Sequence, residues 1–233
     1  MGKSYSEGFD SIYCYPNTNI LINKLNIQDQ DELHLAEADI TSQRINQIKK
    51  SGWIPGDFDI NHLKAIHRHI FQDIYSWAGE IRTVDIAKSN MFCRAMFIKD
   101  QLTYTFNQLH KENCLQNITD IDVMSERLSY YLSEINAVHP FREGNGRTQK
   151  LFIEHIADQA GYQIHFSKIS DQDMITASIR SFKCDYGLMN KLMRQCISPK
   201  TTLEKTGKSR PIPFADITEK GNNTNPDDDY SIR

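Results

Sequence analysis

Apolar residues recur at helical spacing through most of this chain. Leu33, Ala36, Ile40 and Ile48 form the first such run, and Ser51-Gly52 ends it. The pattern predicts helices over residues 31–50, 59–74, 123–138, 147–159, 171–182 and 188–193. We therefore expect a mainly α-helical protein.

Three residues at the ends of these runs fit capping positions. Asp59 and Asp171 stand where a side-chain oxygen can accept the free amides of a first helical turn. Gly161 follows the fourth helix and is expected to end it.

One stretch alternates apolar and polar residues instead. Residues 81–86 (IRTVDI) fit a strand, Lys88-Ser89-Asn90 fits a turn, and residues 92–98 could return as a second strand. A single hairpin does not form a stable sheet of its own, so it must pack on the helices. The expected fold class is mainly α, a helical bundle with a single β-hairpin.

Apolar residues become sparse near the carboxyl end. Residues 200–233 contain only seven of them, together with six basic and six acidic side chains. Such a composition is typical of a linker or a disordered tail. We therefore expect an N-terminal extension at 1–59 whose helix packs on the core, a core domain at 60–198, and a flexible tail or linker at 199–233.

Composition narrows the classes of protein further. The 233 residues are 39% hydrophobic and 24% charged, with a net charge of −3. This charge gives no general footprint for nucleic acid, and no run of about 18 apolar residues predicts a transmembrane segment. The five cysteines are not arranged in CxxC pairs, so neither a disulfide framework nor a zinc ribbon is expected. We expect no nucleic-acid partner and no membrane span.

The segment HPFREGNGRTQK, residues 139–150, carries the most informative chemistry. It joins the end of one predicted helix to the start of the next. Gly144 and Gly146 allow backbone conformations closed to other residues, and successive amides in such a turn form an anion nest at the helix N-terminus. Arg147 adds a planar guanidinium that suits phosphate oxygens. The pattern therefore predicts a phosphate-binding turn.

Two further side chains of this segment indicate a reaction. Glu143 places a carboxylate beside the phosphates, which it would repel unless a cation such as Mg²⁺ lay between them. His139 is the side chain best suited, with an ordinary pKa of about 6.5, to take a proton from an attacking hydroxyl. Together these groups describe phosphate-ester chemistry.

Two other interpretations of the segment fit less well. A Walker A loop needs G-x-x-x-x-G-K-[ST] after a strand, whereas Leu151 follows Lys150 and the preceding segment is helical. A merely structural glycine-rich turn would not need His139, Glu143 and Arg147 together.

From His139 to Arg147 the segment resembles the signature H-P-F-x-[DE]-G-N-G-R-x-x-R of the Fic/DOC family. The resemblance extends from about Ile60 to Gln195, and residues 71–82 (FQDIYSWAGEIR) are similar to the segment that leads into the family's flap hairpin. Within the family the chain most resembles the Fic domains of the Bartonella Bep effectors. The resemblance implies a helical fold with a β-hairpin flap over the active site, and an enzyme that transfers AMP from ATP to a hydroxyl of a target protein.

The resemblance also assigns roles to single residues. It makes His139 the general base and Glu143 the ligand of Mg²⁺, so ATP and Mg²⁺ are the expected cofactors. The residues that it assigns to nucleotide binding are Gly144, Asn145, Gly146, Arg147 and Lys150, together with Lys88, Ser89 and Asn90 of the flap.

One position departs from the signature, because Lys150 stands where the family has its final arginine. Lysine keeps the charge but loses the bidentate geometry of a guanidinium. A poorly aligned α-phosphate would slow transfer sharply. The alternative is therefore a nucleotide-binding interaction module with weak or no transferase activity. The motif also leaves open the transfer of another group, such as UMP or phosphocholine.

The resemblance further implies partners and a location. The expected target is a protein with a Tyr, Ser or Thr hydroxyl, bound along the flap by strand addition. The family's inhibitory pattern, [ST]-x-x-x-E-[GN], does not occur, because only Ser76 and Glu80 have its spacing and Ile81 follows them. A separate small antitoxin-like protein is therefore the expected inhibitor. As a type IV secretion effector, the chain would lie in the bacterial cytoplasm before secretion and in the host cytoplasm afterwards.

Three other histidines are expected to pack or to lie on the surface. His67 and His69 are two residues apart on one predicted helix, so they cannot face one metal ion. His155 lies beyond the motif on the following helix and is expected to pack in the core.

Overall fold

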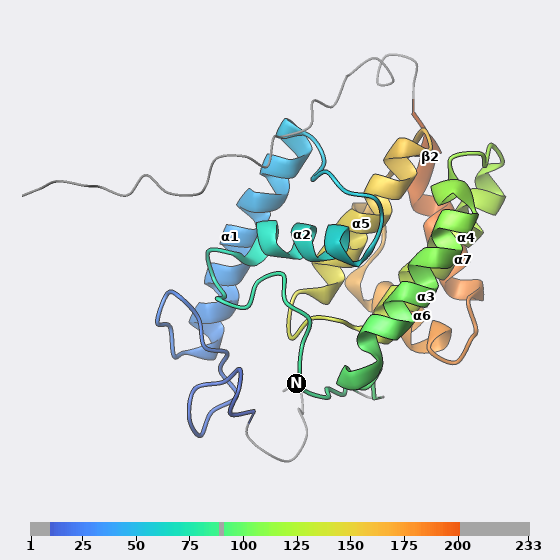
Figure 1. Ribbon diagram of the computed structural model, residues 1–233. Helices are drawn as coiled ribbons and strands as arrows, with labels where there is room; N and C mark the ends of the chain where they lie inside the picture. Colours follow the sequence, from blue (N-terminus) through green and yellow to red (C-terminus); the bar gives the residue numbers. More distant parts are fainter. Residues whose placement is uncertain (1–9, 89–90, 201–233) are drawn as a thin grey trace, which may run out of the picture.

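The computed structural model describes residues 10–88 and 91–200 (Figure 1). The helices are α1 (Gln30–Ser51), α2 (Ile60–Phe71), α3 (Ile98–Lys111), α4 (Ile121–Val138), α5 (Asn145–Gln159), α6 (Asp171–Ser181) and α7 (Gly187–Cys196). The strands are β1 (Tyr162–Ile164) and β2 (Ile197–Pro199). The expected mainly helical fold is confirmed.

Helices α4 and α5 lie at the centre of this bundle. Helix α2 packs on α5, and α1 (blue in Figure 1) packs on α2. On the other side, α3 and α7 pack on α4, and α6 packs on α7. Within the described ranges none of these helices is long and apolar enough to cross a membrane.

One apolar core connects the first helix to the last. Leu33 and Ile48 of α1 belong to the same buried cluster as Ile66 of α2 and Met193 of α7. Each such side chain contributes roughly 1.5–3 kcal/mol when it leaves water. Helix α1 is therefore packed on the core, while residues 201–233 of the expected tail lie outside the described residues.

The helix ends are set by local chemistry. The Asp59 side chain accepts a hydrogen bond from the first turn of α2, as predicted. Ser170, not Asp171, is the N-cap of α6. Gly161 follows Ala160, the C-cap of α5, and has a φ of +86° that glycine adopts without strain.

The predicted hairpin is present in outline but is barely hydrogen-bonded. One bridge joins Ala87 to Met91, and the Phe92 N–H donates to the Ile86 carbonyl over 3.2 Å. An isolated pair of strands gains little stability without a sheet to join. We call residues 81–93 the flap.

The prediction of a return strand over residues 92–98 is wrong. This segment leads into a 3-10 turn at Ala95–Phe97, and α3 starts at Ile98. Helix α3, which the sequence analysis did not predict, buries Leu102 and Phe106 one helical turn apart. Its apolar face packs on α4, which overrides the alternation seen at its start.

A small antiparallel sheet was not predicted. Strand β1 pairs with β2, with Tyr162 opposite Pro199 and Ile164 opposite Ile197. Strands of three residues are too short for alternation to be visible in the sequence. The pairing fastens the end of α7 to the segment that follows α5.

A pair of buried histidines packs beside α5, as expected for His155. The His62 Nδ1 accepts from the Phe58 N–H (3.2 Å), so its Nε2 carries the hydrogen and donates to the Ile54 carbonyl (2.9 Å). The His155 Nδ1 lies 3.3 Å from this Nε2, and Trp53 stacks on the His155 ring. Both imidazoles are therefore neutral in the folded protein.

Stability is expected to fall in mild acid because of this pair. Burial lowers the pKa of His62, and it lowers the pKa of His155 to about 3. The unfolded chain binds protons below about pH 6.5 that the folded chain excludes, so the free energy of unfolding decreases as the pH falls from there toward 3. Each histidine contributes up to about 1.4 kcal/mol per pH unit. Urea unfolding at pH 7.5 and 5 measures the loss, and His155→Gln should reduce it. Equal losses in both proteins would contradict this assignment.

Candidate active site

The imidazole of His139 is held at the end of α4, beside a cavity of about 330 Å³. His139 has a left-handed backbone (φ 51°, ψ 63°), and its N–H donates to the Ile135 carbonyl. Its Nδ1 lies 3.3 Å from the Asn136 carbonyl, which can only accept, so Nδ1 carries the hydrogen. The lone pair of Nε2 is therefore left to accept a proton.

The environment of His139 favours this neutral form. Its side chain lies beneath Phe92 of the flap, with ring centroids 3.8 Å apart. Burial and the charge of Lys88 lower the pKa of His139 to about 3. At neutral pH the imidazole is thus unprotonated, as a general base must be.

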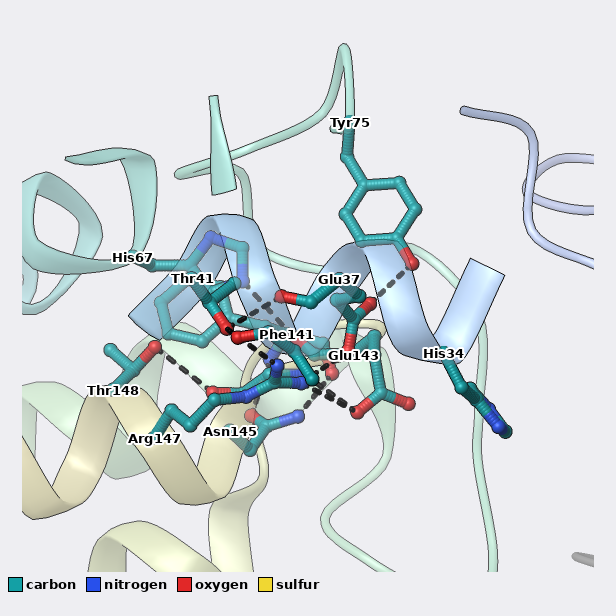
Figure 2. Close-up of polar contacts among 12 residues, drawn as sticks. His34, Glu37, Thr41, His67, Tyr75, Phe141, Glu143, Asn145, Arg147 and Thr148 are labelled. Carbon is teal, nitrogen blue, oxygen red and sulfur yellow. Dashed lines mark hydrogen bonds and ion pairs between the residues drawn. The ribbon is translucent and has the colours of Figure 1, made fainter. Parts of the chain in front are cut away.

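The turn after His139 is closed by reciprocal hydrogen bonds (Figure 2). The Asn145 side chain accepts from the Phe141 N–H (2.9 Å) and donates to the Phe141 carbonyl (2.7 Å). Phe141 stacks on His67 with ring centroids 3.9 Å apart. His67 Nε2 donates to the Glu143 carbonyl (3.0 Å), while its Nδ1 accepts from the Gly79 N–H (2.8 Å). His67 therefore supports the turn, a role that the sequence analysis did not predict.

Gly144 and Gly146 serve the turn in different ways. A Cβ on Gly144 would lie 2.2 Å from the Phe71 ring, and its φ of +79° disfavours other residues. A Cβ on Gly146 would meet nothing within 4 Å, and its φ is not positive. The predicted need for special backbone freedom is therefore confirmed at Gly144 and wrong at Gly146, which instead lines the cavity.

The N-terminus of α5 opens toward this cavity. Its N-cap, Gly144, offers no side-chain acceptor to the amides of the first turn. Asn145 and Gly146 of that turn line the cavity together with His139. Free amides and a helix dipole favour an anion at such a position, by roughly 0.3–2 kcal/mol from the dipole alone.

The cavity has one polar side and one apolar side. Four apolar side chains, Met174, Ile175, Ile179 and Phe182, face the turn from α6 and its C-cap. On the polar side the Gln149 amide donates to Asn136 Oδ1 (3.1 Å), and its own Oε1 is buried without a partner among the described residues. Buried acceptors are normally satisfied, so this oxygen is suited to a donor on a bound ligand.

A larger cavity, of about 420 Å³, lies between α2 and α3. Lys64, Lys99 and His110 are among its lining residues, and no residue of the 139–150 segment is. We therefore place the candidate site at the smaller cavity, where the predicted base and anion nest meet.

The Glu143 carboxylate is suited to bind a cation together with the phosphates of a ligand. Its Oε1 accepts from the Gly144 N–H (2.9 Å) and lies 3.8 Å from the Arg147 guanidinium. Residues 10–88 and 91–200 contain no group of three or more His, Cys, Asp or Glu side chains that could hold a metal ion. Mg²⁺ is commonly bound by one or two carboxylates, with phosphate oxygens and water completing its shell. A single carboxylate at the cavity is compatible with that arrangement.

Arg147 is engaged by α1 (Figure 2). It donates to Thr41 Oγ1 (3.1 Å) and to Glu37 Oε1, and it lies over the Phe71 ring. The Tyr75 hydroxyl donates to the other oxygen of Glu37 (2.5 Å). Arg147 is not among the described residues that line the cavity. The structure therefore assigns it an ion pair that joins α5 to α1, and phosphate binding by Arg147 stays a prediction.

The remaining residues predicted to contact the nucleotide differ in where they lie. Lys88 lines the cavity from the flap. The Lys150 Nζ lies over the Phe166 ring, 5.7 Å from its centroid, and is not among the described lining residues. Ser89 and Asn90 lie outside the described residues.

The Glu37 ion pair should matter for stability. Glu37→Gln removes the nearer of the two described carboxylates around Arg147 and leaves only Glu143, 3.8 Å away, so we expect the free energy of unfolding to fall by about 1–3 kcal/mol. Tyr75→Phe, the matched control, removes one hydroxyl from the same carboxylate and should cost about 1 kcal/mol. Urea unfolding compares the two variants, and equal stability of Glu37→Gln and the wild type would contradict the assignment.

Comparison with known proteins places this geometry in context. A model of the Fic/DOC family matches residues 57–157. The protein adenylyltransferase VbhT of Bartonella schoenbuchensis is 37% identical over 207 residues, which cover 88% of this chain and 43% of VbhT. The protein y4lH of Sinorhizobium fredii, named a probable protein adenylyltransferase, is 37% identical over 185 residues, or 79% of this chain and 94% of y4lH. The chain thus spans less than half of VbhT but nearly all of y4lH.

Solved structures agree with the fold. The N-terminal Fic domain of a VirB-translocated Bep effector from Bartonella quintana, with bound ADP, superposes with a TM-score of 0.76 at 27% identity. The match covers 82% of this chain and 97% of that domain. BepC of Bartonella tribocorum, with bound AMPPNP, has the same TM-score at 24% identity and covers 82% of this chain and 98% of its own. The arrangement of helices around the cavity is therefore that of Fic domains.

Proposed function

The chain belongs to the Fic/DOC family, and from this premise we propose that it is a protein adenylyltransferase. It transfers AMP from ATP to a hydroxyl side chain of a target protein. The observation that carries this proposal is the neutral His139, with Nε2 free to accept a proton, beside the open N-terminus of α5 in one cavity. Relatives named for the same activity support it.

The residues of the turn would divide the work of transfer. Amides of the first turn of α5 bind the α- and β-phosphates. The apolar side chains of α6 contact the adenine ring of ATP. His139 takes the proton from the target hydroxyl as its oxygen bonds to the α-phosphorus. The bond from the α-phosphorus to the bridging oxygen breaks, and pyrophosphate leaves. Mg²⁺, held by Glu143 and the phosphates, would offset their negative charge.

Nucleotide binding without transfer is the less supported alternative. Its motivation is Lys150, which keeps the charge of the family's arginine but lies over Phe166. The relatives are named as transferases, and this favours transfer over nucleotide binding alone.

We extend the proposal to the partners and location of the chain. Similarity to a VirB-translocated Bep effector domain supports a secreted effector whose target is a host protein, presented along the flap. Because the inhibitory pattern does not occur in the sequence, a separate antitoxin-like protein would control it before secretion.

Two measurements test the proposal. The chain is incubated with host-cell lysate, Mg²⁺ and ATP labelled at the α-phosphate, and a labelled protein band is expected. The melting temperature is then compared with ATP, UTP and CDP-choline, since only a bound donor raises it. We expect the largest rise with ATP. An unlabelled lysate, or a larger rise with another donor, would contradict the proposal.

A further inference from the structure

A buried arginine joins the flap to the end of α4. Only 1% of the Arg82 surface is exposed. Its Nε donates to the His139 carbonyl (2.9 Å) and its Nη1 to the Val84 carbonyl (2.6 Å). Its Nη2 donates to the carbonyls of Cys93 and, over 3.3 Å, Val138. We call residues 81–88 the first arm of the flap and residues 91–93 its second arm. One guanidinium thus binds four carbonyls: one from each arm, and those of Val138 and His139 at the end of α4.

Backbone hydrogen bonds connect the same segments. The Arg82 N–H donates to the Pro140 carbonyl (2.9 Å), and the Cys93 N–H donates to the Ala137 carbonyl (3.2 Å). The first arm of the flap is therefore fastened just after His139, and the second arm just before it. Among the described residues of the flap a single bridge joins the two arms, so regular strand pairing contributes little to holding them.

Stability alone is a poor reason for this arrangement. Removing a guanidinium from water is costly, and the four acceptors of the Arg82 side-chain hydrogen bonds are neutral backbone carbonyls. Burial accordingly lowers the pKa of Arg82. Its positive charge does suit the carbonyl end of α4, where the last carbonyls lack helical partners. A charge buried at this cost beside a functional turn indicates a role in the geometry of that turn.

The backbone of His139 needs such support. A left-handed conformation is uncommon for a residue other than glycine and costs on the order of 1 kcal/mol or more. The carbonyl bond to Arg82 fixes the residue on one side, and the N–H bond to Ile135 fixes it on the other. The imidazole is then aimed into the cavity beneath Phe92.

We propose that Arg82 is a positioning residue for transfer, which fixes both arms of the flap to the end of α4 and so sets the distance between a flap-bound target and His139. This inference rests on the proposed function. Arg82 is buried and is not among the described residues that line the cavity. Its loss should therefore lower the rate of transfer at saturating ATP and leave the affinity for ATP nearly unchanged.

The test compares Arg82→Lys and Arg82→Met with the wild type. Lysine keeps the charge but places its donors on one nitrogen, which cannot span three segments, and methionine keeps only the volume. Arg127→Lys is the matched control, because Arg127 lies in the first half of α4, whereas the turn follows its last residue, and it binds Glu112 through two nitrogens. Labelling of the same lysate band by α-labelled ATP is measured over a range of ATP concentrations.

We expect the saturated rate to fall about 100-fold in Arg82→Lys, further in Arg82→Met, and not in Arg127→Lys. The ATP concentration that gives the half-maximal rate should stay within about threefold of the wild-type value. The ATP-induced rise in melting temperature should stay within a few degrees of the wild-type rise.

Several outcomes would overturn this inference. An unchanged rate of transfer in Arg82→Lys would do so. A lower rate that is fully explained by weaker ATP binding would also do so. Loss of the cooperative unfolding transition in both variants would assign Arg82 a purely structural role. If the wild type labels no protein, the proposed function fails and this inference fails with it. If the wild type labels protein and Arg82→Lys labels it at the same rate, only this inference fails.

Discussion

His139→Ala is expected to reduce the rate of transfer by about 100- to 10,000-fold, the usual contribution of a general base. The imidazole is the neutral group at the cavity whose Nε2 can accept the hydroxyl proton, and no other described histidine lines that cavity. The anion nest belongs to α5 and does not depend on the imidazole. ATP binding should therefore be preserved.

The measurement is the rate at which α-labelled ATP labels protein, read beside the ATP-induced rise in melting temperature. His110→Ala is the matched control, because His110 is an exposed histidine of α3 away from the turn. Labelling by His139→Ala at the wild-type rate would disprove the role of His139. A loss of ATP binding in that variant would show that the imidazole supports the nest instead.

Gly144→Ala is expected to have the largest effect on the turn itself. The new Cβ would lie 2.2 Å from the buried Phe71 ring, in a backbone conformation that costs alanine roughly 1–2 kcal/mol. Crowding in a packed core adds about 1–3 kcal/mol. We expect a total loss of about 2–5 kcal/mol in the free energy of unfolding, and with it the loss of ATP binding.

Gly146→Ala provides the contrast, since it adds the same methyl group two residues along the chain. It meets nothing within 4 Å and has no positive φ, so stability should be unchanged or slightly higher. Urea unfolding and ATP-induced melting shifts measure both variants. The Phe71→Leu exchange in the Gly144→Ala background should recover part of the loss if the ring is the cause. Equal stability of the two alanine variants would contradict this account.

The site could be predicted because its parts are close in sequence. His139, Glu143 and Gly144 lie within one turn between two helices, so their proximity follows from the chain itself. The helices around them could also be predicted, because each buries one apolar face at regular spacing.

The contacts that could not be predicted join residues far apart in sequence. Glu37 pairs with Arg147 across 110 positions, and it lies outside the segment that the family model matches. On sequence spacing it resembles any solvated carboxylate of a helix. His67 likewise owes its role to the turn at Glu143, 76 positions later. Spacing within one helix carries no information about such partners.

The flap shows a different limit. Alternation over residues 81–86 predicted a strand, yet this arm is held by Arg82 and by α4 more than by a partner strand. Side-chain hydrogen bonds to carbonyls can replace a ladder, and no alternation pattern signals them. Helix α3 was missed for a related reason: its packing on α4 favours the helix, and the local alternation at its start does not reveal that contact.

The measurement that tests adenylyl transfer most directly compares two labels in one reaction. The chain is incubated with lysate, Mg²⁺ and ATP labelled either at the α-phosphate or at the γ-phosphate, and the labelled protein is hydrolysed to identify the attached group. We expect label from the α-phosphate alone, attached as AMP and absent with His139→Ala. Label from the γ-phosphate, or no label from either, would contradict adenylyl transfer by this chain.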